Sequence, residues 1–282
     1  VTRELWVSGD GADRSLGNVD VVFPILHGPF GEDGTIQGML TLMDLPFVGS
    51  GVLASSVGMD KHFTKTVLQA AGIPVAPWRT VKRFDWRHRP QAIMAMVEQM
   101  SLPVFVKPAR AGSSVGVSKV ADWSELAAAL DSAFREDDHV LIEAGMVGRE
   151  VECAVLQGMP GQPTRASVAG EIVISGREFY DFEAKYLDAP GIDLVCPAAL
   201  SGEQLNELQR LSIRAFEAID GAGLARVDFF LTAEGFVLNE INTMPGFTPI
   251  SMFPRCWQES GLSYSALIDE LITVALAHHE AD

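Results

Sequence analysis

Two short apolar runs near the carboxyl-terminal end predict the element that organises the rest of the chain. Residues 224–231 and 236–241 are rich in β-branched and aromatic side chains, and a polar stretch with one glycine separates them. This pattern is typical of a β-hairpin. We expect a three-residue loop, Ala233-Glu234-Gly235, in which Gly235 adopts the positive φ that such loops favour.

The hydrophobic pattern elsewhere predicts a mixture of helices and strands. The near-continuous apolar run at residues 19–26 is consistent with a strand buried on both faces. Further strands are expected at 102–108, 139–143, 150–156 and 166–174. Helices are expected at 35–44, 55–71, 90–100, 122–135 with Asp122 as its N-cap, 202–220 and 263–279.

Composition narrows the class of partner. The 282 residues are 48% hydrophobic, enough for a sizeable core and about two domains by length. The formal net charge of −16 disfavours nucleic acid and anionic membranes as partners. Three scattered cysteines and the absence of a long apolar run or signal peptide favour a reducing compartment, with the cytoplasm as the default.

The expected hairpin register brings charged and polar side chains to one face. Asp228 lies opposite Glu240, while Asn242 and Arg226 point to the same side. Two carboxylates at this spacing repel each other, and burying them unpaired is costly. A Mg²⁺ ion with phosphate completing its shell would remove the conflict, and Arg226 could neutralise the bound anion. The alternative is a surface hairpin with solvated charges.

Two glycine-rich loops are candidates for ligand binding. Residues 27–34, HGPFGEDG, connect a predicted strand to a predicted helix, the place where α/β sheets bind ligands. Residues 112–116, GSSVG, follow a strand that ends in Lys107 and could cover phosphates with backbone N–H groups. The alternatives are a plain connecting loop and an ordinary Gly/Ser loop.

Four segments together carry a family resemblance. They are RVDFF with NEINTMPGFT in the hairpin, HGPFGEDG, the GSSVG loop after Lys107, and FYDFEAKY at 179–186. This set resembles the ATP-grasp ligases and, within them, the D-alanine–D-alanine ligases. The resemblance implies an α/β and α+β ATP-grasp fold, with ATP bound between a central α+β subdomain and a C-terminal antiparallel-sheet domain, after an incomplete Rossmann-like N-terminal domain.

The resemblance also implies three parts of the chain. Residues 1–80 would form the substrate domain, 81–150 the central ATP-grasp subdomain, and 151–282 the C-terminal domain with a lid loop and metal site. The family's first strand and helix, with a Gly-rich turn and a substrate-binding Glu, are not found in residues 1–18. Two further departures are Ala144 in place of a Lys and Phe182 in place of a Tyr.

Site residues carried over from the family fall into a nucleotide set and a metal set. ATP phosphates would meet three lysines and the glycine-rich loop, and adenosine would meet the segment after the strand at 139–143. The nucleotide set is Lys61, Lys107, Lys185, Gly112, Ser113, Ser114, Val115, Gly116, Glu143, Met146 and Glu150. The metal set, for one or two Mg²⁺ or Mn²⁺ ions, is Asp228, Glu240 and Asn242.

The resemblance implies a further set for two D-alanine molecules. His27 would contact the first D-alanine, while Ser251, Met252 and Lys185 would bind the second. Arg226 and the Gly246 N–H would stabilise the oxyanion, and Ser113 would bond to the lid residue Tyr186.

The implied activity is ATP-dependent synthesis of D-alanyl-D-alanine for peptidoglycan in a bacterial cytoplasm, by a homodimer. Alternatives are a ligase that makes D-alanyl-D-lactate, another ATP-grasp ligase, and a non-catalytic nucleotide-binding module. Retention of Lys185 and Tyr186 favours an amine acceptor over a hydroxyl acceptor. Retention of the metal and phosphate residues disfavours the non-catalytic module.

Overall fold

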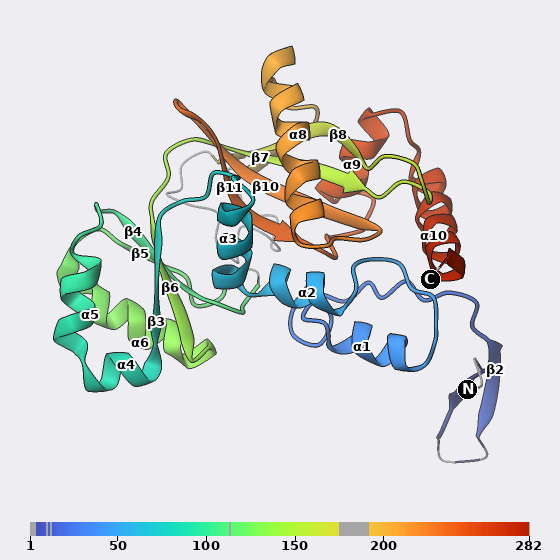
Figure 1. Ribbon diagram of the computed structural model, residues 1–282, viewed down its shortest axis with the longest axis horizontal. Helices are drawn as coiled ribbons and strands as arrows, with labels where there is room; N and C mark the ends of the chain where they lie inside the picture. The colour runs from blue at the N-terminus through green and yellow to red at the C-terminus, as the bar shows by residue number, and fades with distance from the viewer. Residues whose placement is uncertain (1–3, 10, 12, 113, 175–191, 282) are drawn as a thin grey trace.

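The computed structural model describes residues 4–9, 11, 13–112, 114–174 and 192–281. Two antiparallel sheets dominate it (Figure 1). The larger has the strand order β11-β10-β7-β8-β9, and the smaller has the order β3-β6-β4-β5. The strands of the larger sheet are β7 (Arg149–Leu156), β8 (Arg165–Ile174), β9 (Ile192–Val195), β10 (Leu224–Thr232) and β11 (Gly235–Asn242).

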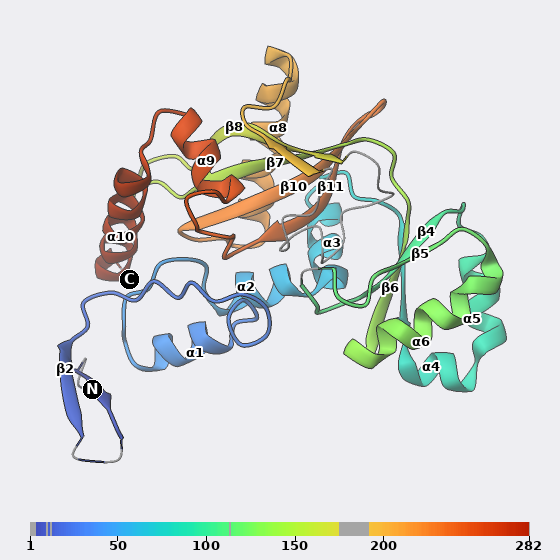
Figure 2. The same cartoon turned by 180° about the vertical axis from the view of Figure 1, so that it is seen from behind.

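Helices cover the larger sheet on both faces (Figure 2). α3 (Lys61–Ala70) and α8 (Gly202–Ala218) pack on one face, and α9 (Met252–Glu259) and α10 (Tyr264–Ala281) pack on the other. Along β7, Cys153 and Val155 join the α3–α8 core, whereas Ala154 joins the α9–α10 core. Residues 153–155 of β7 are therefore all apolar, because both faces of the strand are buried here.

The α9–α10 pair is part of a buried core. In the described part of the chain no single helix is long and apolar enough to cross a membrane, and α9 and α10 reach that composition only when taken together across a 103° bend.

The hairpin that organises the chain is confirmed, with a correction to its loop. Asp228 pairs with Glu240 and Arg226 with Asn242, as expected. The loop, however, has two residues, because Thr232 already pairs with Gly235. The register shifts between Asp228 and Phe229, so the extra residue lies at Asn239, in a bulge on β11. The expected register was thus correct for a different physical reason.

The smaller sheet forms a separate core with its own helices. Its strands are β3 (Trp78–Lys82), β4 (Val104–Pro108), β5 (Ser118–Val120) and β6 (His139–Ala144). Its helices are α4 (Arg83–His88), α5 (Pro90–Val97), the 3₁₀ turn η1 (Trp123–Glu125) and α6 (Leu126–Glu136). Asp122 caps this last pair as predicted, since its side chain accepts a 2.9 Å hydrogen bond from the Ser124 N–H.

The helix expected at residues 55–71 is two helices, α2 (Val52–Met59) and α3. Asp60 interrupts them with extended backbone, and its carboxylate accepts hydrogen bonds from the N–H groups of His62 (3.0 Å) and Phe63 (3.2 Å). The side chain satisfies N–H groups that a helix start leaves unpaired, which makes the break favourable. As a consequence Lys61 stands at the first turn of α3.

The amino-terminal part differs most from expectation. β1 (Glu4–Val7) and β2 (Arg14–Asn18) form an antiparallel ribbon, and α1 (Thr35–Leu42) follows. The strand expected at 19–26 is wrong: Val22 makes one parallel bridge to Phe47, while Ile25 and Leu26 are about half exposed, at 46% and 51%. An extended apolar run becomes a strand only where neighbouring strands pair with it. No Rossmann-like parallel sheet occurs within the described residues.

Contact between β8 and α9 can be tested at Gly170. A Cβ at this position would lie 2.1 Å from Met252 Sδ, so Gly170→Ala forces α9 or the Met252 side chain to shift. We expect urea unfolding to show a loss of about 1–3 kcal/mol. Gly202→Ala is the matched control, because nothing lies within 4 Å of its added Cβ. Equal stability of the two variants would contradict the packing described.

Candidate active site

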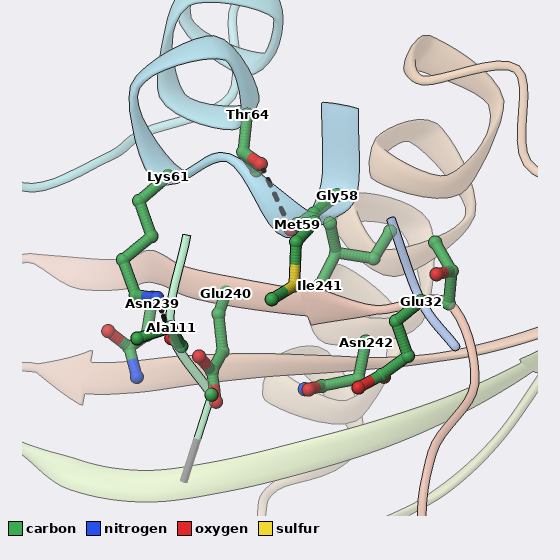
Figure 3. Close-up of a pocket in the computed structure, with 12 residues that line it drawn as sticks. Glu32, Gly58, Met59, Lys61, Thr64, Ala111, Asn239, Glu240, Ile241 and Asn242 are labelled. Carbon is green, nitrogen blue, oxygen red and sulfur yellow. Dashed lines mark hydrogen bonds between the residues drawn. The ribbon is translucent and has the colours of Figure 1, made fainter. Parts of the chain in front are cut away.

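A pocket lies where four separate parts of the chain meet. Its lining comes from β11, from the junction of α2 and α3, and from the loop after β4, with one residue from the 27–34 loop (Figure 3). The lining residues are Glu32, Gly58, Met59, Lys61, Thr64, Ala111, Gly112, Asn239, Glu240, Ile241, Asn242 and Thr243. The fold therefore brings the hairpin, the first turn of α3 and the glycine-rich loop to one place.

The hairpin contributes an interlocked set of charged side chains beside the pocket. Arg226 donates two hydrogen bonds of 2.8 Å to the two oxygens of Asp228. The Asn242 Nδ2 donates a third bond of 2.9 Å to Asp228, so the amide oxygen of Asn242 is left for another partner. Asp228 is 7% exposed, and this compensation allows its charge to be buried.

Arg226 is held by two carboxylates. Its Nε also lies 3.3 Å from Glu152 Oε2 on the neighbouring strand β7. Burial acts against its charge, but Asp228 and Glu152 outweigh burial and hold the pKa of Arg226 above its ordinary value. The guanidinium is therefore a fixed positive charge, orientated before any ligand binds. Glu152 is a member of this site that the sequence analysis missed, and it pairs with Asp228 across β7 and β10.

Glu32 is a second carboxylate in the pocket that the sequence analysis did not single out. It belongs to the HGPFGEDG motif, and the Gly28 N–H donates a 2.6 Å hydrogen bond to its Oε2. Burial, reinforced by the negative charge of Glu240, raises the pKa of Glu32 against the opposing effects of Gly28 and His27. A cation placed between Glu32 and Glu240 would relieve this repulsion.

The opposite side of the pocket carries the predicted phosphate contacts. Lys61 Nζ donates a 2.6 Å hydrogen bond to the Ala111 carbonyl, which links α3 to the glycine-rich loop. The loop is a tight turn, with positive φ at Ser114 (58°) and Gly116 (70°). Only glycine suits the second position, since a Cβ there would lie 2.8 Å from Pro108 Cγ. Val115 closes the turn with a 3.2 Å bond to the Gly112 carbonyl, and Ser113 lies outside the described residues.

Lys107 and Glu143 meet in a buried triad with a residue that the sequence analysis missed, Lys65. Glu143 Oε2 lies 3.2 Å from Lys107 Nζ, and Oε1 lies 3.3 Å from Lys65 Nζ. Lys65 is 1% exposed, and burial lowers its pKa. Burial also acts on Glu143, but the two lysines prevail and keep its pKa below the usual range. Lys65 follows Lys61 by four residues on a helix, a spacing that could have indicated it.

The remaining predicted nucleotide residues lie where β6 leads into β7. Met146 is half-buried in the connection between these strands. Glu150 is the second residue of β7 and pairs with Phe230 of β10. Neither lines the pocket described above, and their contacts to adenosine stay predictions.

Residues predicted to bind the two amino-acid substrates belong to several different segments of the chain. His27 is exposed. Ser251 precedes α9, and its Oγ accepts a 3.1 Å hydrogen bond from the Thr248 N–H. A Cβ on Gly246 would lie 3.1 Å from the same Oγ. The Met252 side chain is buried against Gly170, so any substrate contact of Met252 must use its backbone. Lys185, Tyr186 and Phe182 lie outside the described residues.

The metal assignment stays a prediction. Within the ranges that the structure describes, no group of three or more His, Cys, Asp or Glu side chains is placed to hold a metal ion. The expected set, Asp228, Glu240 and Asn242, contains only two carboxylates and one amide. Its donor atoms are nevertheless all oxygens, as Mg²⁺ prefers, and Glu32 adds another carboxylate.

A sheet edge rich in carboxylate and amide oxygens, facing a lysine and a glycine-rich loop from a second sheet, is the arrangement expected of a ligase of the ATP-grasp class. Family models give the particular family: the D-ala D-ala ligase N-terminus matches residues 4–50, and the D-ala D-ala ligase C-terminus matches residues 67–273. The chain belongs to the D-alanine–D-alanine ligase family.

Individual relatives agree with this family. The chain is 56% identical to the D-alanine–D-alanine ligase of Kocuria rhizophila over 271 residues, which cover 95% of this chain and 71% of that protein. It is 54% identical to the D-alanine–D-alanine ligase of Pseudarthrobacter chlorophenolicus, over 93% of this chain and 70% of that protein.

Solved structures of similar fold include two ligases. The D-alanine–D-alanine ligase from Coxiella burnetii superposes with a TM-score of 0.82 at 38% identity, covering 99% of this chain and 75% of that one. The VanG D-Ala:D-Ser ligase from Enterococcus faecalis gives a TM-score of 0.84 at 36% identity, covering 96% of this chain and 79% of that one.

The Glu143 triad gives a prediction for acid stability. Because the folded-state pKa of Glu143 is lowered, the unfolded chain binds a proton more readily, so the stabilisation is present above about pH 4.5 and is lost as pH falls below it. Glu143→Gln should therefore make the decline of the unfolding free energy below pH 4.5 shallower by up to about 1.4 kcal/mol per pH unit. Urea unfolding between pH 6 and pH 3.5 measures this slope. Identical slopes for both proteins would contradict the ionised, buried triad.

Proposed function

We propose that the protein joins two D-alanine molecules into D-alanyl-D-alanine, with conversion of ATP to ADP and phosphate. The observation that carries the proposal is the meeting of Lys61, Gly112, Glu240 and Asn242 around one pocket, next to the fixed guanidinium of Arg226. The family of the chain and its 54–56% identity to curated D-alanine–D-alanine ligases support the same activity.

The first step activates a carboxylate. A carboxylate oxygen of the first D-alanine attacks the γ-phosphorus of ATP, the bond from that phosphorus to the bridging oxygen of ADP breaks, and D-alanyl phosphate forms. Lys61 and the Gly112–Gly116 loop would neutralise and cover the phosphates, since the loop and the lysine are already joined through Ala111. Lys107 would approach the nucleotide from β4, while Glu143 and Glu150 would contact adenosine.

A divalent metal ion, Mg²⁺ or Mn²⁺, fits the oxygen donors at the end of the hairpin. Asp228, Glu240 and Asn242 would hold one or two ions, and the repulsion between Glu32 and Glu240 is a feature that such a charge would relieve. The ion would neutralise charge on the β- and γ-phosphates. Asn242 suits this role because its Nδ2 is already committed to Asp228, so that its oxygen is orientated as an acceptor.

The second step forms the peptide bond. The amine of the second D-alanine attacks the acyl carbon, the carbonyl oxygen becomes an oxyanion, and phosphate then leaves as the amine loses its proton. Arg226 and the Gly246 N–H would stabilise the oxyanion; Arg226 is suited to this because Asp228 and Glu152 already fix its orientation. His27 would contact the first substrate, and Ser251, Met252 and Lys185 the second. A hydrogen bond between Ser113 and Tyr186 would join the glycine-rich loop to the lid.

This activity belongs to peptidoglycan synthesis, and we propose that the protein acts in a bacterial cytoplasm as a homodimer.

A product assay tests the proposed function. The protein, ATP and Mg²⁺ are incubated with D-alanine, L-alanine, D-alanine plus D-serine, or D-alanine plus D-lactate; phosphate release is measured and products are identified by mass. We expect D-alanyl-D-alanine from D-alanine and no product from L-alanine, with Asp228→Asn as the inactive control. Preferential formation of a mixed D-alanyl-D-serine or D-alanyl-D-lactate product, or ATP binding without any product, would overturn the proposal.

A further inference from the structure

Two of the three cysteines lie close together outside the pocket. The Sγ atoms of Cys196 and Cys256 are 3.7 Å apart although 60 residues separate them in the chain. Cys196 follows β9 directly and is partly exposed, whereas Cys256 lies in α9 and is buried. A disulfide requires an S–S distance of about 2.05 Å, so the two sulfur atoms need to approach by roughly 1.7 Å. The fold therefore holds a dithiol near bonding geometry.

The surroundings of the two thiols shift their pKa values in opposite directions. The side-chain contact with Cys256 and the positive charge of Arg255 lower the pKa of the Cys196 thiol. The same contact and burial raise the pKa of the Cys256 thiol. Cys196 is thus the more accessible and more readily ionised sulfur, which is the profile of a thiol that reacts first with an oxidant.

The third cysteine lacks this arrangement. Cys153 is fully buried in β7, its Sγ lies 3.7 Å from the Ser167 carbonyl oxygen, and burial raises its pKa to about 11. Such a thiol is inert toward oxidants. Cys153 therefore serves as an unreactive control for Cys196 and Cys256.

We propose that Cys196 and Cys256 form a reversible disulfide when the protein meets a peroxide. The Cys196 thiolate attacks one peroxide oxygen, the O–O bond breaks, and a sulfenic acid and hydroxide result. The Cys256 sulfur then attacks the sulfenic sulfur, its proton joins the departing hydroxyl, and water leaves as the S–S bond forms. Two thiols are oxidised and one peroxide is reduced to two waters.

The disulfide would lower the turnover of the ligase; this part of the proposal rests on the proposed function. α9 begins at Met252, immediately after Ser251, the residue assigned to the second D-alanine, and Met252 packs on Gly170 of β8. Drawing Cys256 toward Cys196 moves α9 along this tight contact and with it the Ser251 end of the helix. Because displacements of about 1 Å at reacting groups can cost up to 100-fold in rate, we expect oxidation to lower turnover at least several-fold, reversibly.

The chemical test uses the full chain treated with hydrogen peroxide. Free thiols are alkylated, the protein is digested, and peptides are identified by mass. The proposal predicts a Cys196–Cys256 cross-linked peptide, loss of two thiols per chain, alkylation of Cys153 only after unfolding, and complete reversal by dithiothreitol. Cys196→Ser should abolish the cross-link, and Cys153→Ser, the matched control, should retain it.

A second variant, Cys256→Ser, keeps the proposal testable if Cys196→Ser fails to fold. In Cys256→Ser, Cys196 should stop at the sulfenic acid and be trapped by dimedone. Oxidation of Cys196 to sulfinic acid without any cross-link in the native protein, or a cross-link that forms only in urea, overturns the proposal.

Turnover is measured separately on the reduced and oxidised protein. A cross-linked protein with unchanged turnover would overturn the link to Ser251. A reduced protein that makes no D-alanyl-D-alanine would instead count against the proposed function, because the mass readout of the disulfide does not depend on activity.

Discussion

The compensation of the buried Asp228 carboxylate is the interaction on which the site depends. An ionised carboxylate inside an apolar sheet is strongly disfavoured unless charged or polar partners surround it. Arg226 supplies two hydrogen bonds and Asn242 a third, all from the same hairpin. The arrangement fixes the orientation of the Arg226 guanidinium, which can then bind an anion. It also leaves the side-chain oxygen of Asn242 as an acceptor for another ligand. A single local constraint thus orientates the groups that the proposed reaction needs at its charged centre.

The two sheets then supply the rest of the pocket. The break at Asp60 places Lys61 at the first turn of α3, and Lys61 bonds to the loop after β4, so a residue of the smaller sheet's loop is tied beside β11. The bulge at Asn239 lets Glu240 and Asn242 share a face with Asp228 although the hairpin loop has only two residues. The positions of the site residues therefore depend on a helix cap, a β-bulge and a loop contact more than on the strands themselves.

Sequence reasoning reached much of this arrangement because alternation along a hairpin is a strict rule. It placed Asp228 opposite Glu240 and Asn242 beside them, and it found the glycine-rich loop after Lys107. It failed at 19–26, where an apolar run has one bridge partner, Phe47, instead of a sheet. It also missed Glu32, Glu152 and Lys65. Their roles arise from contacts between elements distant in the chain, and spacing within one element, such as that from Lys61 to Lys65, does not identify the partner across the fold.

We propose that the end of the hairpin binds the nucleotide through a divalent cation. Calorimetric titration of ATP with and without Mg²⁺, in the wild-type protein and in Glu240→Gln, tests it most directly. Glu234→Gln is the control with the same change of charge in the exposed hairpin loop. We expect Mg²⁺ to tighten ATP binding at least tenfold in the wild type and in Glu234→Gln but not in Glu240→Gln. Equal Mg²⁺ dependence in all three proteins would contradict it.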